Sequence, residues 1–462
     1  MRRTVLNPTE DNIMKSLEEN IFGRNMDLNY FLELLSNIEG PYSLALNGAW
    51  GSGKTFFIKQ AEMVLNAYNN NFDMDYEQRD KVKNTFRIND SSLQELQCIY
   101  YDAWKNDSGL DPIYSLIYSI TGGYEHFKGD RVDKDKMISL GIEIVSALIP
   151  LVPSVAMRGI LSRIPVEKIR NQLKSENPLD PVKKQLELEE KTREFFGNLN
   201  AGRENNLIIF IDELDRCRPD FAVQLLERIK HYFDSANITF VFSVNLDQLV
   251  HTIKKFYGSS FEAGRYLGRF FDQVVQLPKP NLSKYYQSAQ ADGSLFFDQT
   301  VRNFIESFQL SLRDIANYIH MEKTVKDSLT KQDDFSNAFR GHTGTFLNQC
   351  IIPLLIGVNV IAPETFNALI AGENKEKFIQ LVEKTAYMYV LKDDIKVVNE
   401  RQEIIKRDAS IESGLEAIYR ALFDPEFKDK DVIIGSYKFT EGDREFVRKT
   451  AALLSGYASY KN

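Results

Sequence analysis

NGAWGSGKTFF, residues 47–57, is the stretch that decides the fold of this chain. It matches the pattern G-x-x-x-x-G-K-[ST] through Gly48, Gly53, Lys54 and Thr55. Glycines let such a loop bend until successive backbone N–H groups point inward and bind phosphate oxygens. We expect Lys54 to reach the β- and γ-phosphates of a nucleotide, and the Thr55 hydroxyl to ligate Mg²⁺.

The residues on either side of the loop predict the strand and the helix that this motif requires. Residues 43–46 form a short apolar run that is typical of a buried strand. Helical spacing follows the loop at Phe56, Phe57, Gln60, Ala61 and Val64. The N-terminus of that helix adds partial positive charge beneath bound phosphates. The residues expected to contact the nucleotide here are Gly48, Ala49, Trp50, Gly51, Ser52, Gly53, Lys54, Thr55 and Phe56.

Length, charge and cysteine content limit the class of protein. A chain of 462 residues is too long for one compact core and predicts two or three domains. The net charge of −8 argues against a protein that binds nucleic acid over its whole surface, but it leaves room for a local basic groove. Three separated cysteines and five scattered histidines predict neither disulfides nor a metal site other than Mg²⁺. With no apolar signal segment at the N-terminus, we expect a cytoplasmic protein.

Residues 137–157, MISLGIEIVSALIPLVPSVAM, form an apolar segment long enough to span a bilayer. Pro150 and Pro153 break a helix there, and Glu143 is costly in lipid. A single crossing would also separate the phosphate loop from the acidic strand described below, and two crossings would leave each half too short. We therefore expect a buried or interface helix, with peripheral membrane contact as the alternative.

Strand and helix patterns alternate along much of the chain. The expected strands after the loop lie at residues 98–101, 207–211, 238–244 and 274–277. Helical segments separate them, which is typical of a parallel α/β sheet. We expect an N-terminal helical segment over residues 1–40 and a P-loop core over 41–280, with a helical insertion at about 105–204. Residues 281–462 are expected to form an all-α lid or partner domain.

The second candidate part of the site is LIIFIDELDRCRP, residues 207–219. Asp212 ends an apolar strand, which places a carboxylate where α/β sheets bind ligands, and we expect it to hold Mg²⁺. Glu213 follows and is able to orient or deprotonate the attacking water. An acidic pair after a strand is also a common helix N-cap, but its combination with the phosphate loop favours a nucleotide site.

Asn245 directly follows the expected strand at residues 238–244. Its side chain either contacts the attacking water or the γ-phosphate, or it is an ordinary turn residue. Asp215, Arg216 and Arg218 follow the acidic pair. They are placed either to brace the site or to bridge to a neighbouring subunit, and bracing is favoured.

Three arginines are candidates to complete the site. Arg265 and Arg269 precede the last expected strand. An arginine at this position is able to reach the γ-phosphate bound by an adjacent subunit. The alternative is that both form salt bridges at the surface. Arg313 lies in the C-terminal helical region and is able to bend back onto the phosphates from a lid. A guanine-reading pattern at residues 330–333 has no preceding strand, so we expect ATP as the nucleotide.

Four separated motifs resemble the KAP family of P-loop NTPases. They are WGSGKT at 50–55, YDAWKND at 101–107, IDELDRC at 211–217 and FFDQVVQLP at 270–278. The resemblance covers about residues 20–320. It implies a three-layer parallel sheet of the additional-strand-catalytic-glutamate (ASCE) class, often with transmembrane helices inserted between the phosphate-binding and acidic motifs. The apolar segment 137–157 occupies that place but fails the crossing argument, so this chain looks like a soluble member.

The resemblance implies further site residues and a biological setting. IFGR, which ends at Arg24, is similar to the segment that contacts adenine or its ribose in related switch-type ATPases. GRFFD, residues 268–272, looks like the inter-subunit arginine segment of AAA+ proteins, which favours Arg269. Soluble bacterial members are frequently encoded in antiviral-defence loci, which implies a role in phage defence.

These observations predict a Mg²⁺-dependent ATPase switch that forms a homo-oligomer and controls a protein partner or effector. A nucleic-acid motor or clamp-loader-like machine needs a basic, aromatic-lined channel, which the net charge of −8 does not indicate. A third alternative is a scaffold that binds ATP without hydrolysing it. Such a scaffold does not need the catalytic carboxylates, so the presence of Lys54, Asp212 and Glu213 argues against it.

Overall fold

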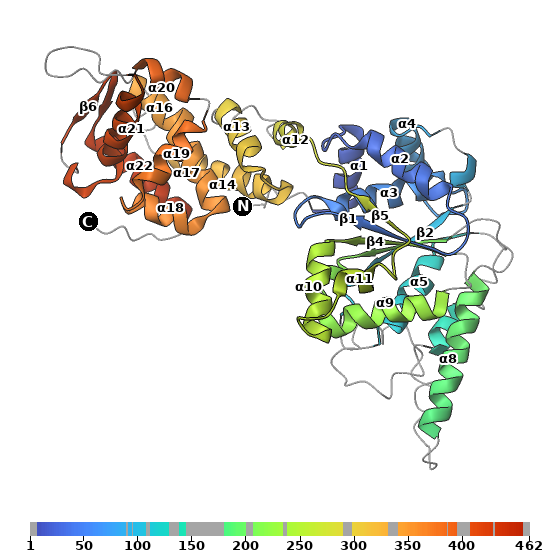
Figure 1. The fold of residues 1–462 in the computed structure, drawn as a ribbon. Helices are drawn as coiled ribbons and strands as arrows, with labels where there is room; N and C mark the ends of the chain where they lie inside the picture. Colours follow the sequence, from blue (N-terminus) through green and yellow to red (C-terminus); the bar gives the residue numbers. More distant parts are fainter. Residues whose placement is uncertain are drawn as a thin grey trace. The chain divides into compact units, whose positions relative to one another are not determined.

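The phosphate loop joins β1 (Tyr42–Asn47) to α3 (Lys54–Tyr68) in this computed structural model (Figure 1). Gly51 and Gly53 have φ angles of 76° and 89°, in the left-handed region that residues with side chains rarely adopt. Gly53 directly precedes α3, so its left-handed turn sends the chain from the loop into the helix. Gly53 of the motif and the neighbouring Gly51 are therefore needed for the shape of the loop.

The structure describes residues 7–88, 91–94, 96–107, 111–128, 138–144, 180–199, 207–233, 238–289, 298–330, 341–385, 387–394, 407–427 and 430–455. The chain divides into two units, called here the core unit (Pro8–Lys279) and the C-terminal unit (Pro280–Asn462, with which Met1–Asn7 are grouped). Residues 145–157 of the predicted apolar segment and 331–333 of the guanine-reading pattern lie outside the described residues.

A parallel sheet forms the centre of the core unit (Figure 1). Within the described residues it has five strands in the order β2-β3-β4-β1-β5. The strands after β1 are β2 (Gln97–Asp102), β3 (Leu207–Asp212), β4 (Ile238–Val244) and β5 (Gln273–Gln276). Because β4 lies between β1 and β3, one additional strand separates the phosphate loop from the acidic strand, which confirms the predicted α/β P-loop fold.

Helices cover both faces of this sheet, because every residue of β3 and β4 is buried and needs apolar cover on each side. On one face α3 packs with α1 (Glu10–Glu18), α2 (Asn25–Ser36) and α4 (Tyr76–Thr85). The other face carries α5 (Pro112–Tyr124), α9 (Pro219–Phe233) and α10 (Leu246–Tyr257). α8 (Asp180–Leu199) packs on α9, and α11 (Ala263–Leu267) precedes β5. The N-terminal helices α1 and α2 thus belong to the core unit.

The described part of the apolar insertion lies in the hydrophobic core. Residues 138–144 are helical, and Leu140 and Ile144 are buried in the same apolar cluster as α5 and β2. Glu143 forms an ion pair with Lys191 of α8 at 2.5 Å. These residues pack as expected for a buried helix, and the charge that would be costly in lipid has a cationic partner within the protein.

The C-terminal unit is mostly helical. Its helices are α12 (Leu282–Ala289), α13 (Asp298–Phe308), α14 (Leu312–Thr330), α16 (Gly341–Phe346), α17 (Ile352–Ile361), α18 (Pro363–Ile370), α19 (Lys375–Glu383), α20 (Met388–Asp394), α21 (Arg407–Phe423) and α22 (Glu441–Ser455). A π-helical turn, Leu347–Ile351, joins α16 to α17. The sequence predicts an all-α region here, but the structure also contains a hairpin of β6 (Val432–Ile434) and β7 (Tyr437–Phe439).

The hairpin forms because VIIGSYKF places two β-prone runs around a Gly-Ser turn. Gly435 has a φ of 56°, the left-handed conformation that a tight hairpin turn requires. Tyr437 and Phe439 are buried, and both rings contact Phe346 of α16. Strands of three residues are too short for a clear alternating pattern, so the turn residues were the available signal.

Among the described residues, the helical run Gly341–Ile361 is long and apolar enough to cross a membrane by length and composition. Of its most apolar window, 67% is buried within the protein. A core helix of a globular unit has the same composition, so this run is weak evidence for a membrane span.

The close approach of α17 to α13 gives a first prediction. A Cβ at Gly357 would lie 2.3 Å from Cε1 of Phe304, so we expect Gly357→Ala to overpack the C-terminal unit and destabilise it by about 1–3 kcal/mol. Urea unfolding of the full chain measures this change. The control is Gly442→Ala in the same unit, where the nearest contact of a Cβ is Thr440 Oγ1 at 3.7 Å. Equal stabilities of the two variants would contradict the prediction.

Candidate nucleotide site

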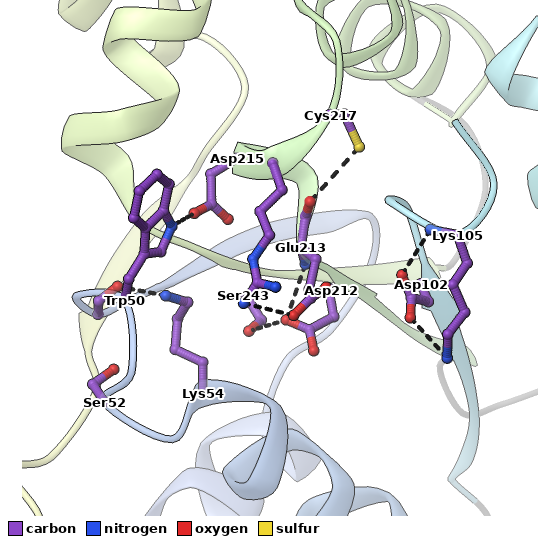
Figure 2. A network of polar contacts seen from close by, with 12 residues as sticks. Trp50, Ser52, Lys54, Asp102, Lys105, Asp212, Glu213, Asp215, Cys217 and Ser243 are labelled. Carbon is purple, nitrogen blue, oxygen red and sulfur yellow. Dashed lines mark hydrogen bonds and ion pairs between the residues drawn. The ribbon is translucent and has the colours of Figure 1, made fainter. Parts of the chain in front are cut away.

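The candidate site lies at the carboxyl ends of the central strands. The register pairs Asn47 of β1 with Val244 of β4, and Ser243 of β4 with Asp212 of β3. Because the strands are parallel, the phosphate loop after β1 and the carboxylate at the end of β3 lie at the same end of the sheet (Figure 2). The structure therefore brings together the two motifs that the sequence singles out.

Lys54 folds back onto the phosphate loop. Its Nζ donates to the carbonyl oxygens of Gly48 at 2.6 Å and Ala49 at 3.3 Å. Burial lowers the pKa of Lys54, while the nearby negative charges of Asp215 and Asp212 raise it. An ammonium buried beside carboxylates is suited to exchange the loop carbonyls for phosphate oxygens.

The backbone of the loop also fits a phosphate. A Cβ at Gly48 would lie 3.0 Å from Ser52 Oγ and 3.2 Å from Leu277 Cβ, so the loop closes tightly at this glycine. Thr55 lies half-buried in the first turn of α3, as a metal-ligating hydroxyl requires. The Phe56 side chain packs on Phe22 with ring centroids 5.3 Å apart, which leaves its backbone N–H as the group to contact a phosphate.

Asp212 is fully buried, and both of its carboxylate oxygens accept hydrogen bonds; Figure 2 shows those from Ser243 and Glu213. Oδ1 accepts from Ser243 Oγ at 2.7 Å and from the Glu213 N–H at 3.0 Å. Oδ2 accepts from the Tyr100 hydroxyl at 3.0 Å. These neutral donors offset part of the cost of burying the charge and leave it available to a cation.

The donor set fits Mg²⁺. The Asp212 carboxylate and the Thr55 hydroxyl offer oxygen ligands only, which is the preference of Mg²⁺. Among the described residues, no group of three or more His, Cys, Asp and Glu side chains is placed to hold a metal by itself. Such a site suits an ion that takes its remaining ligands from substrate phosphates and water.

Glu213 has a left-handed backbone, with a φ of 60°. A residue with a side chain is rarely found there, and such strain is common at functional sites. Its Oε1 pairs with Arg216 Nη2 at 2.8 Å. Burial raises the pKa of Glu213, whereas the charge of Arg216 lowers it.

Residues 212–218, called here the acidic turn, are braced from both sides. Asp215 accepts a hydrogen bond from Nε1 of Trp50 in the phosphate loop at 2.5 Å (Figure 2). Arg216 lies over the Trp104 ring, 5.4 Å from its centroid. Arg218 Nε pairs with Asp107 at 2.8 Å. All three contacts lie within the core unit, which favours the bracing interpretation of these residues over a bridge to another subunit.

Arg24 directly precedes α2 and is 3% exposed. Its Nη1 donates to the Ser52 carbonyl of the phosphate loop at 3.0 Å. Among the described residues, its Nε and Nη2 have no hydrogen-bond partner. Burial lowers the pKa of Arg24 to about 10. Buried donors without acceptors fit a bound group that is rich in acceptors, such as a nucleotide.

The remaining polar candidates lie at different places. The Asn245 side chain caps α10 by accepting from the Gln248 N–H at 3.3 Å, so its contact with a γ-phosphate stays a prediction. Arg265 and Arg269 are exposed and precede the amino end of β5. Because β5 is parallel to β1, they lie toward the end of the sheet opposite the phosphate loop. Arg313 is exposed in the first turn of α14, in the C-terminal unit.

Comparison with known proteins identifies the family of this site. The family model described as the KAP family P-loop domain matches residues 25–304. The chain belongs to the KAP family of P-loop NTPases. None of the curated proteins compared with it matches. A solved structure of Drosophila ORC bound to GC-rich DNA and Cdc6 matches at 9% identity with a TM-score of 0.32, covering 98% of this chain and 67% of that one. A TM-score this low carries no argument about function.

Two residues of this KAP-family site were not predicted from the sequence. Tyr100 and Ser243 donate to Asp212 from the neighbouring strands. Trp50 was expected to contact the nucleotide, but its hydrogen bond to Asp215 was not predicted. The signal for Ser243 was its place near the carboxyl end of an expected strand next to that of Asp212. Tyr100 offered no such signal. It lies beside Phe210 in the strand register, but its hydroxyl reaches Asp212, two residues further along β3.

The unpartnered donors of Arg24 predict opposite effects on stability and binding. Without nucleotide, Arg24→Met removes a buried charge that lacks full compensation, so we expect the midpoint of thermal unfolding to rise by a few degrees, at about 2–4 °C per kcal/mol. We expect ATP affinity to fall at least about tenfold, since a charged hydrogen bond contributes about 1.5–3 kcal/mol. Thermal unfolding and titration calorimetry measure the two effects.

The matched control is Arg79→Met. Arg79 donates to the carbonyl oxygens of Ala67, Asn69 and Phe72 at 2.6–2.7 Å, so its loss should lower the unfolding midpoint without changing ATP affinity. Unchanged ATP affinity in Arg24→Met would contradict the assignment of Arg24 to the nucleotide site.

Proposed function

We propose that this KAP-family chain is a Mg²⁺-dependent, ATP-binding and ATP-hydrolysing switch. The observation that carries the proposal is the convergence of Lys54, Asp212 and Glu213 at one end of the sheet, with the Asp212 carboxylate buried and oriented by donors on both oxygens. A protein that only stores ATP has no need of a buried, oriented carboxylate and a second acid beside it.

Each residue of the site has a role in this proposal. Lys54 and the loop N–H groups would hold the β- and γ-phosphates, and Thr55 and Asp212 would hold Mg²⁺. When bound, Mg²⁺ neutralises the charge that develops on the transferred phosphate. Glu213 would accept a hydrogen bond from the attacking water and orient it. Arg24 would contact the nucleotide with the donors that lack partners among the described residues.

Internal contacts of the catalytic side chains favour a switch over a continuously active hydrolase. Lys54 is engaged by loop carbonyls, and Glu213 is engaged by Arg216. Both side chains must change partners before hydrolysis is possible. A site that needs this rearrangement is able to respond to nucleotide, to a partner protein or to another subunit.

The position of Arg265 and Arg269 supports a homo-oligomer. Asp272, which follows them, exchanges hydrogen bonds with the backbone of Ser43 near the amino end of β1. The phosphate loop follows the carboxyl end of that same strand. An arginine at this place is suited to the site of another copy rather than its own, and Arg269 is the one that we propose to act there. Participation of Arg313 stays a prediction.

The alternative of a nucleic-acid machine finds little support in the charges of the core unit. The cations around the acidic turn are already paired: Lys105 with Asp102, Arg216 with Glu213 and Arg218 with Asp107. We propose a cytoplasmic location, in which the buried free thiols of Cys98, Cys217 and Cys350 stay reduced. The antiviral setting stays a prediction, because the chemistry of the site is the same in any setting.

Hydrolysis per molecule should rise with protein concentration if copies complete each other's sites. We expect Glu213→Gln to lower the rate about 10²–10⁴-fold with ATP binding retained. Arg269→Ala should remove the dependence on concentration, and Arg265→Ala is the matched control. A phosphate-release assay over a range of protein concentrations measures these rates.

Mixing the Glu213→Gln and Arg269→Ala variants tests whether the arginine acts on another copy. A Glu213→Gln subunit keeps its arginine and is able to supply it to the intact acidic pair of an Arg269→Ala neighbour. An equimolar mixture should therefore hydrolyse ATP faster than either variant alone. A wild-type rate that is independent of concentration, together with no gain on mixing, would rule out a site shared between copies.

A further inference from the structure

We propose that Tyr100 is a positioning residue for Asp212, and that Lys59 holds the Tyr100 ring in place for that role. This inference rests on the proposed function, because positioning of a metal-binding carboxylate has meaning only if Asp212 holds Mg²⁺. It concerns a strand, β2, that contributes no residue to the sequence motif for phosphate or metal.

The hydroxyl of Tyr100 secures one side of the carboxylate. Oδ1 of Asp212 is held by two donors, Ser243 Oγ and the Glu213 N–H. Among the described residues, the Tyr100 hydroxyl is the only donor to Oδ2, at 3.0 Å. Rotation about the Cβ–Cγ bond moves both oxygens, so the two donors on Oδ1 resist it, and a donor on Oδ2 adds a further restraint. The Tyr100 contact therefore helps to fix the plane of the group.

Tyr100 keeps its proton in this environment. An ordinary tyrosine phenol has a pKa of about 10. The side chain is therefore a neutral phenol at physiological pH, and its O–H donates to the carboxylate rather than competing with it for a cation.

Lys59 links this support to the helix of the phosphate loop. Its Nζ lies 3.3 Å from the centroid of the Tyr100 ring and pairs with Glu62 Oε2 at 2.7 Å. A cation over the ring face holds the ring in one orientation and draws electron density from it, which strengthens donation by the hydroxyl. Lys59 lies one helical turn after Thr55 on α3, so one helix carries a metal-ligating hydroxyl and the support of the metal-binding carboxylate.

Tyr101 provides a matched comparison one residue away. It is 1% exposed, and its hydroxyl shares a 2.6 Å hydrogen bond with Ser115 Oγ of α5. Successive strand residues point to opposite faces, so Tyr101 points away from the α3 face that Tyr100 occupies. Loss of either hydroxyl removes one side-chain hydrogen bond from the same strand, buried at Tyr101 and partly buried at Tyr100, but only Tyr100 contacts Asp212.

The experiment compares Tyr100→Phe with Tyr101→Phe in the full chain. Mn²⁺ replaces Mg²⁺, and electron paramagnetic resonance measures free Mn²⁺ during titration in the presence of a non-hydrolysable ATP analogue. We expect the Mn²⁺ dissociation constant to rise about tenfold or more in Tyr100→Phe and to stay unchanged in Tyr101→Phe. The midpoint of thermal unfolding should fall in both variants, because each loses a side-chain hydrogen bond of β2. For ATP hydrolysis, the Mg²⁺ concentration for half-maximal activity should rise in Tyr100→Phe alone.

Equal Mn²⁺ affinities in the two variants would overturn the proposal and leave Tyr100 with a structural role. Lys59→Met tests whether Lys59 holds the Tyr100 ring in place. An Mn²⁺ affinity weaker than that of the wild type supports this role, and an unchanged affinity overturns it. If the wild-type chain shows no Mn²⁺ binding that depends on the analogue, the proposed function fails instead. The failure of the two proposals is thus distinguishable.

Discussion

The negative charge buried at the end of β3 sets conditions that the surrounding core unit must meet. Asp212 is fully buried, and burying a charge without partners is strongly unfavourable. The neighbouring strands meet this condition from both sides: β4 supplies Ser243, and β2 supplies Tyr100. The strand order β2-β3-β4 is therefore needed for the electrostatics of the site as well as for the cover of the sheet.

The phosphate loop and the acidic turn are joined through two side chains of the loop, Trp50 and Lys54. Trp50 connects the loop to Asp215, and Lys54 lies in the field of the same carboxylates. A change at one motif therefore alters the hydrogen bonding and charge at the other. This coupling gives a physical basis for a site whose loop and acidic turn respond together to a ligand.

The pattern of residues along the sequence predicted the fold well where a structural feature depends on residues that are close together in the sequence. Buried parallel strands are continuous apolar runs, and β1 to β4 were located from such runs, whereas β5 is short and partly exposed. The glycines of the loop and the carboxylate after β3 were likewise visible, because each is required by backbone geometry or strand polarity. The Tyr100 hydroxyl, the Trp50 indole and the Arg216 ion pair join residues far apart in sequence or depend on side-chain direction, so no periodicity reveals them. The short hairpin of the C-terminal unit was missed for a different reason, since its strands are too brief to show alternation.

The placement of the tryptophans has an optical consequence. The chain has two tryptophans, and both lie half-exposed against the acidic turn, Trp50 at 47% and Trp104 at 53%. Trp50 donates to a carboxylate, whereas Trp104 lies beneath a guanidinium. Indole emission depends on nearby charge and solvent, so the tryptophan fluorescence of the whole protein originates at the candidate nucleotide site. The unlabelled chain thus carries its own spectroscopic reporter of which side chains Asp215 and Arg216 contact.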